Sequence, residues 1–150
     1  MYTRIVRQTV EQGFQRLSQG DPEAILSKFS PTTNFRFLGD HAIGANLSTP
    51  GAIRQWFERI LRLFPGIEIV PSRVQVSGMP WDTLVVVQLA IRVPLPEGRS
   101  YRNTGMQMLR LRWGRVIEDY VVEDTVLLVN ALQELAQRGV SEAAAAPITD

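Results

Sequence analysis

Three long strand patterns in the second half of the 150-residue chain are the strongest constraint on its fold. They cover residues 83–93, 100–113 and 116–123, where apolar side chains recur as they do in strands. Short connections, including a tight turn at residues 114–115, make neighbouring strands antiparallel. Strands this long with connections this short predict a strongly curved sheet, and its concave side needs helices to cover it.

The first half of the chain has the apolar periodicity of helices that could cover such a sheet. Apolar residues recur at helical spacing over residues 5–17, and Asp21 before a proline predicts the start of a short second helix. Thr49 is the expected N-cap of a third helix, and Asp124 is that of a last one. The apolar face predicted for the third helix consists of Ile53, Trp56, Phe57, Ile60, Leu61 and Phe64.

Two further strands complete the expected sheet. We predict a turn at residues 30–33, a short strand over residues 34–38, and another strand over residues 68–76. Pro71 places this last strand at a sheet edge or at a bulge, because proline cannot donate a ladder hydrogen bond. Helices followed by an antiparallel meander predict an α+β fold, built as one domain over residues 1–139.

The two ends of the chain carry little pattern. The first eight residues lack the apolar segment of a signal peptide, and no apolar run approaches the ~18 residues of a membrane span. We therefore expect a cytoplasmic protein without a membrane segment. Residues 140–150, which include four consecutive alanines, are expected to form a loosely held C-terminal tail.

The composition excludes several classes of function. Lys and Arg number 16 against 15 Asp and Glu, so the net charge of +1 gives no electrostatic case for a nucleic-acid partner. The absence of cysteine excludes disulfides, a cysteine–zinc site and a thiol nucleophile. The single histidine, His41, excludes a multi-histidine metal centre. We expect no metal and no cofactor.

Three stretches of the sequence resemble the nuclear-transport-factor-two-like superfamily, in its SnoaL-like and ketosteroid isomerase-like branch. They are residues 20–25 (GDPEAI), 51–57 (GAIRQWF) and 109–119 (LRLRWGRVIED). The superfamily contains ketosteroid isomerases, SnoaL-like polyketide cyclases, limonene epoxide hydrolases, dehydratases and non-catalytic members. The resemblance implies a cone-shaped half-barrel, in which a curved mixed or antiparallel sheet carries the N-terminal helices on its concave face. It also implies an apolar cavity and a homodimer that pairs sheet to sheet.

Alternation along residues 100–113 selects the polar residues that could enter the cavity. Three arginines share one face, which is then the solvent or interface side, so the other face points inward. The inward candidates are Tyr101, Asn103 and Gln107. The resemblance places Gln107 where the isomerases hold their oxyanion-hole acid, and its amide can donate a hydrogen bond there. The alternative is a buried amide that the backbone satisfies.

The strand over residues 116–123 has a carboxylate on each face, so alternation alone does not orient it. The resemblance implies that Asp119, Val121 and Glu123 point inward. Val121 stands where the cyclases carry their acid/base aspartate, and Asp119, two residues earlier on the same face, is the candidate to replace it. A carboxyl group in an apolar cavity has a raised pKa and can transfer protons near neutral pH. The alternative puts Asp119 and Glu123 in solvent at the rim.

Asp40 and His41 are the other catalytic candidates. Counting back from the third helix, the resemblance places Asp40 near the general base of the isomerases, whereas counting forward from the second helix places Phe37 there. His41 could orient Asp40 and titrate near neutrality. The alternative is that both residues only form a turn. The isomerases' tyrosine on the first helix has no counterpart around Phe14, so steroid isomerase activity is not expected.

These residues lead to two expectations for function. The first is a protein that binds a small, largely apolar molecule in the cone, with Phe37 and Trp56 among the lining residues. It would carry out isomerase, cyclase or dehydratase chemistry by acid/base catalysis. The second is a non-catalytic binding or dimerisation module, in which Phe35, Phe37, Trp56 and methionine side chains fill the cavity.

Overall fold

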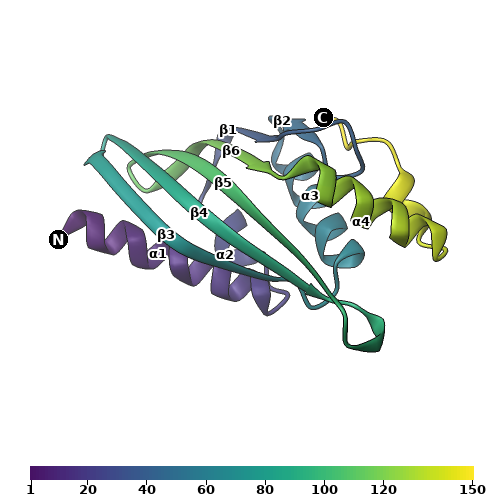
Figure 1. Cartoon of the computed structure of the whole chain (residues 1–150). Helices are drawn as coiled ribbons and strands as arrows, with labels where there is room; N and C mark the ends of the chain where they lie inside the picture. The colour runs from purple at the N-terminus through teal and green to yellow at the C-terminus, as the bar shows by residue number, and fades with distance from the viewer.

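One curved, unclosed sheet runs through the computed structural model, which describes residues 1–150 (Figure 1). Its spatial order places the second strand at one edge and the third at the other, as β2-β1-β6-β5-β4-β3. All neighbouring strands are antiparallel except β1 and β6, which are parallel. The strands are β1 (Phe29–Phe37), β2 (Ala45–Leu47), β3 (Glu68–Met79), β4 (Asp82–Pro94), β5 (Ser100–Arg112) and β6 (Arg115–Glu123).

The helices α1 (Tyr2–Ser18), α2 (Glu23–Leu26) and α3 (Pro50–Leu63) lie against the concave face of this sheet, and α4 (Thr125–Gln137) follows β6. In Figure 1 the sheet arches over α1 and α2, while α3 stands across the end of the arch. The mixed α+β cone predicted from the sequence is therefore confirmed. None of these helices combines the length and the apolar character that a bilayer span requires.

The helix starts follow the capping residues in the sequence, with one shift. Thr49 Oγ1 accepts a hydrogen bond from the Ala52 backbone N–H at 3.4 Å, which confirms it as the N-cap of α3. Asp124 Oδ1 caps α4 by accepting from the N–H groups of Val126 and Leu127. The helix α2 begins one residue later than predicted, at Glu23, and Asp21 Oδ1 accepts from the N–H of this residue.

The expected turn at residues 30–33 is wrong, because these residues belong to β1. Thr33 is buried and its hydroxyl donates to the Val116 carbonyl of β6, and the register shifts between Phe29 and Asn34. The composition of residues 30–33 favours a turn, but their pairing with the central strand β6 keeps them extended. The short strand β2 was not expected either, since only its pairing with β1 makes it a strand. The prediction for Pro71 is confirmed, because β3 is an edge strand and its register shifts there.

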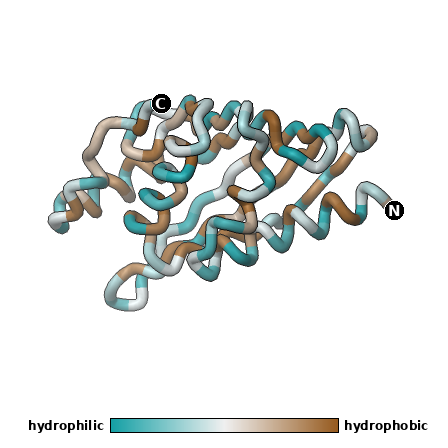
Figure 2. The backbone as a smooth tube through the Cα atoms, turned by 180° about the vertical axis from the view of Figure 1, so that it is seen from behind, coloured by the Kyte–Doolittle hydropathy of each residue, from teal (hydrophilic) through white to brown (hydrophobic).

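The core lies between the sheet and the three N-terminal helices, where hydrophobic residues (brown in Figure 2) alternate with hydrophilic ones (teal) along the chain. Trp56 of α3 is its largest member and is 4% exposed. Its ring centroid lies 4.7 Å from that of Phe35 and 5.0 Å from that of Phe57, and its Nε1 donates to the Ile43 carbonyl at 2.8 Å. This cluster joins α3 to β1 and forms one wall of the cone.

The C-terminal residues are not loosely held, contrary to the prediction from their composition. Ala143 is buried, and Arg59 of α3 donates to the Ala146 carbonyl at 2.8 Å. The Asp150 carboxylate accepts from the backbone N–H groups of Ser48 and Thr49 at 2.9 Å each, and these bonds lower its pKa to about 2. The tail therefore packs along α3 and adds a negative charge beside the N-terminus of this helix.

We predict that Trp56→Ala lowers the free energy of unfolding by about 3–5 kcal/mol, because it leaves a cavity and an unpaired Ile43 carbonyl. Urea unfolding measures this loss. Trp113→Ala is the matched control, because Trp113 is 72% exposed and its removal should change stability by less than about 0.5 kcal/mol. A loss below about 1 kcal/mol for Trp56→Ala would show that α3 does not pack as described.

Candidate functional site

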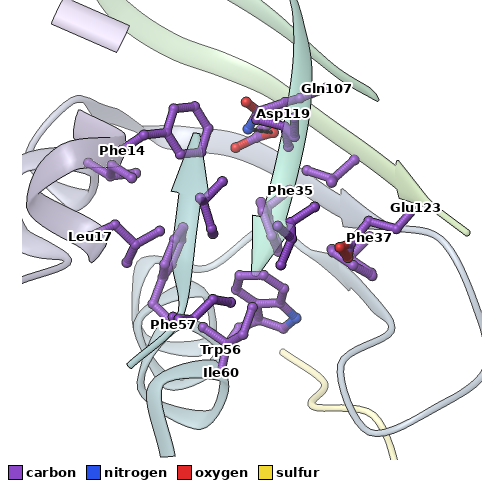
Figure 3. A pocket seen from close by; sticks show the side chains of 16 residues that line it. Phe14, Leu17, Phe35, Phe37, Trp56, Phe57, Ile60, Gln107, Asp119 and Glu123 are labelled. Carbon is purple, nitrogen blue, oxygen red and sulfur yellow. Dashed lines mark hydrogen bonds between the residues drawn. The ribbon is translucent and has the colours of Figure 1, made fainter. Parts of the chain in front are cut away.

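A partly enclosed cavity lies between the concave face of the sheet and the helices α1, α2 and α3 (Figure 3). The space that the centre of a water-sized sphere can occupy in it is about 60 Å³, below the range of about 300–1,000 Å³ of small-molecule sites, so a ligand has to displace lining side chains to enter. Thirteen of its sixteen lining residues are hydrophobic, among them Phe14 of α1, Phe37 of β1 and Trp56 of α3. The three polar lining residues all come from the central strands and are Gln107, Asp119 and Glu123.

Strand register brings these three side chains to the concave face. Gln107 of β5 lies opposite Val121 of β6, and Asp119 lies opposite Leu109. The pairing shifts by one residue after Arg110, and this irregularity sets the face that the rest of β6 presents to the helices. Asp119 is consequently 3% exposed, so the alternative that it is solvated at the rim is wrong.

Asp119 and Gln107 form one hydrogen-bonded pair inside the cavity. Gln107 Nε2 donates to Asp119 Oδ1 at 2.9 Å, and this is the only hydrogen bond that the carboxyl group makes within the chain. Gln107 Oε1 is buried and has no partner, so the alternative in which the backbone satisfies this buried amide is wrong. Burial raises the pKa of Asp119 to about 7, although the bond from Gln107 opposes the shift. The carboxyl group can therefore both accept and release a proton near neutral pH.

Glu123 places a second carboxyl group at the cavity, four residues beyond Asp119 on the same strand. Figure 3 shows it beside Phe37, away from the Asp119–Gln107 pair. It is half-buried, it makes no hydrogen bond or ion pair within the chain, and burial raises its pKa to about 7. Gly105 faces it on β5, where a Cβ atom would lie 2.9 Å from Glu123 Cγ. The missing side chain at Gly105 leaves the room that Glu123 occupies.

The structure places Tyr101 and Asn103 outside this cavity, contrary to prediction. Asn103 is buried as expected, but its Nδ2 donates to Tyr101 Oη at 2.7 Å and to the Asp124 carbonyl at 3.0 Å. The Tyr101 ring stacks on Phe64, and burial raises its pKa to about 12. Both side chains therefore hold the start of α4 against β5. Alternation correctly predicted that they point inward, but it does not tell the cavity from the packed core.

Asp40 and His41 form a turn, which was the alternative to their catalytic reading. Asp40 is exposed and does not line the cavity. The His41 ring accepts from the Ile43 N–H at Nδ1 and contacts the Leu38 carbonyl through Nε2 at 3.2 Å, and burial lowers its pKa. Phe37 lines the cavity in place of Asp40. These contacts commit both nitrogens of the histidine to the backbone.

Sequence reasoning missed part of the apolar lining. Phe14, Leu17 and Ile25 of the first two helices and Phe57 of α3 all reach the cavity. Apolar periodicity identified each as a residue of a buried helix face, but it carries no signal that separates a cavity wall from a filled core. Nowhere in the chain do three or more His, Cys, Asp or Glu side chains gather in a way that could hold a metal ion.

The sequence comparison agrees with this geometry. Residues 10–119 match the family described as SnoaL-like domain, and the chain belongs to this family, within the nuclear-transport-factor-two-like superfamily. The match covers both helices and strands of the cone, including Gln107 and Asp119. No curated protein matches the sequence.

Solved structures share the fold at low sequence identity. A provisionally assigned SnoaL-like polyketide cyclase from Jannaschia sp. CCS1 is 19% identical, with a TM-score of 0.69, over 86% of this chain and 92% of that one. PrhC from Penicillium brasilianum NBRC 6234 is 15% identical, with a TM-score of 0.76, over 95% and 94%. A protein with a ketosteroid isomerase-like fold from Catenulispora acidiphila DSM 44928 is 16% identical, with a TM-score of 0.62, over 75% and 82%.

We predict that Asp119→Asn stabilises the protein at pH 8 much more than at pH 5. The pKa of Asp119 is about 3.8 in the unfolded chain and about 7 in the folded protein. At pH values between these two, the native state keeps the Asp119 proton that the unfolded chain releases. Stability therefore falls as the pH rises through this window. Each pKa unit corresponds to about 1.4 kcal/mol, so wild type should lose about 2–3 kcal/mol more than Asp119→Asn between pH 5 and pH 8.

Chemical denaturation at the two pH values measures the difference. Glu118→Gln is the matched control, because Glu118 is the preceding residue of β6 and does not line the cavity. It should follow wild type at both pH values. Equal pH dependence of all three proteins would show that Asp119 is not a buried acid.

Proposed function

We propose that this protein binds a small, largely apolar molecule in the cone and uses Asp119 to move a proton on it. The observation that carries the proposal is the buried Asp119–Gln107 pair in an otherwise apolar cavity. A carboxyl group with a pKa of about 7 is divided between its two forms at neutral pH, as a general acid/base needs to be. The family supports a small-molecule site of this kind.

The geometry suggests how the pair would work. Gln107 holds Oδ1 of the Asp119 carboxylate, which leaves Oδ2 free toward the cavity. Oδ2 takes a proton from a carbon next to a carbonyl group, and the electron pair of that C–H bond moves into an enolate. Asp119 then returns the same proton to another atom of the molecule. This sequence gives an isomerisation, and the enolate is also the nucleophile that a cyclisation requires.

Relatives of the same fold support small organic molecules as the ligand class. The Jannaschia protein carries a provisional assignment as a polyketide cyclase, and TerC was co-crystallised with polyporic acid. TerC is 18% identical to this chain. At such identity the likeness extends to the fold, and the chemistry proposed here rests on Asp119 and Gln107. The lack of cysteine supports a cytoplasmic setting as part of the proposal.

Proton exchange into a simple ketone tests the proposal. We predict that the protein speeds the exchange of the methyl protons of acetophenone with D2O, measured by NMR, and that Asp119→Asn lowers this rate by at least about 100-fold. Glu118→Gln should exchange like wild type. The rate should not change with EDTA, because no residue cluster that could hold a metal takes part. A loss that added metal restores would contradict this mechanism, as would an unaltered rate in Asp119→Asn.

A non-catalytic binding module is the second candidate, and one observation favours it. Val121, an apolar side chain, lines the cavity at the position where the resembling cyclases carry their aspartate. Such a module would bind acetophenone without exchanging its protons. The same NMR experiment, run with a binding measurement, therefore separates the two functions.

We also propose that the protein forms a homodimer through the convex face of the sheet. Met106 of β5 is 45% exposed and Leu84 of β4 is 40% exposed on this face, and the exposed Arg102 and Arg112 lie on the same face of β5. An apolar strip among charged residues is typical of a contact surface, and two-fold pairing is the commonest closed arrangement.

Sedimentation at tens of micromolar should give about twice the 16.9 kDa mass of one chain. Met106→Glu should shift the protein toward the monomer, because it buries a charge in the proposed contact. Val126→Glu is the control, since Val126 is 70% exposed on α4, away from the sheet face. A wild-type protein that sediments only as a monomer would contradict the dimer.

A further inference from the structure

Asp119 and Gln107 line a second cavity as well as the first. This cavity offers about 70 Å³ to the centre of a water-sized sphere and lies between α1, α2 and the turn end of the β5–β6 hairpin. Along β6, Val121 and Glu123 on one side of Asp119 line the first cavity, whereas Val116 on the other side lines the second. The polar pair therefore stands between two separate spaces.

Only side chains divide the two cavities. Phe14 of α1 and Ile25 of α2 line both of them, together with the polar pair. Ile25 lies close against the α1 backbone at Gly13, where a Cβ atom would be 3.2 Å from Ile25 Cγ1. Rotamer changes are common when a ligand binds, so Phe14 and Ile25 are the two apolar side chains that a ligand spanning both cavities has to displace.

Polar atoms without a hydrogen-bond partner lie between the two cavities, on Gln107 and Asp119. Gln107 is 8% exposed and its Oε1 has no partner, and Asp119 Oδ2 has none either. A buried polar atom without a partner costs free energy, which a ligand recovers when it supplies the missing donor or acceptor. Away from Asp119 and Gln107 the second cavity is lined mostly by apolar side chains, including Val10, Leu109 and Leu111, and its other polar lining residues are Thr9 and Lys28.

We propose that the two cavities form one binding site for a molecule that has a carbonyl or hydroxyl group near its middle and an apolar ring on each side. The central oxygen meets Asp119 and Gln107, one ring enters the space beside Trp56, and the other enters the space beside Val10. Phe14 and Ile25 move apart to admit the molecule. The inference rests on the proposed function, because it takes the Asp119–Gln107 pair as the point of ligand contact.

Two ketones that differ in shape test this inference. The carbonyl group of acetophenone carries one ring and a methyl group, whereas that of benzophenone carries a ring on each side. In calorimetric titrations benzophenone should bind roughly ten- to a hundredfold more tightly, because burial of a second ring adds apolar contact area. Equal affinities would overturn the inference.

Variants that change only the second cavity make the test specific. Ala24→Leu fills part of it from α2, so benzophenone affinity should fall to nearly that of acetophenone while acetophenone binding is unchanged. Leu17→Phe is the matched control, because Leu17 lines only the first cavity. This variant should weaken the binding of both ketones, whereas Ala24→Leu should weaken the binding of benzophenone alone. If Ala24→Leu does not fold, Val10→Phe fills the same cavity from α1.

The outcomes separate the inference from the function on which it rests. If neither ketone binds, both fail. If acetophenone binds and exchanges its protons but benzophenone binds no more tightly, the two-cavity site is wrong and the acid/base function stands. If benzophenone binds more tightly and Ala24→Leu does not reduce its affinity, its second ring lies elsewhere and the inference fails.

Discussion

The pairing of β6 with β5 and β1 determines what the cavity contains. Successive side chains of a strand point to opposite faces, so a slip of one residue would turn Asp119 and Glu123 to the convex face and bring Glu118 and Tyr120 to the helices. Two strands hold β6, one parallel and one antiparallel, and the shift after Arg110 fits its register to β5. This pairing makes Asp119 a buried acid beside Gln107 rather than one more charge on the surface.

A buried carboxyl group with one hydrogen bond opposes folding at neutral pH, because its ionised form has lost most of its hydration. The aromatic cluster of Trp56, Phe35 and Phe57 offsets this cost through its large buried apolar area. The same cluster lines the cavity that Asp119 faces. Stability and the proposed acid/base chemistry thus depend on the same packing of α3 against β1, while Gln107 limits the rise of the Asp119 pKa.

In the proposed two-cavity site, two polar groups between two largely apolar spaces would define the ligand more closely than a single pocket would. A cavity that ends at an acid favours a molecule with a terminal polar group, whereas an acid between two cavities favours a polar group at the centre. The side chains of Phe14 and Ile25 line both cavities. In the proposed site, the packing of α1 and α2 on the sheet would therefore set the length of the molecule that fits.

Local sequence determined the elements of this protein and much of their orientation. Apolar periodicity and the capping residues Thr49 and Asp124 predicted α3 and α4, and alternation along β5 correctly turned Gln107 inward, because these patterns depend on residues close together in the chain. Tertiary structure alone decided the rest. The extended form of residues 30–33, the burial of Asp119 and the docking of Asp150 on α3 each depend on partners distant in sequence. A pattern that records which side chains are apolar cannot record whether the space they face is filled or empty, and that difference separates the cavity from the core.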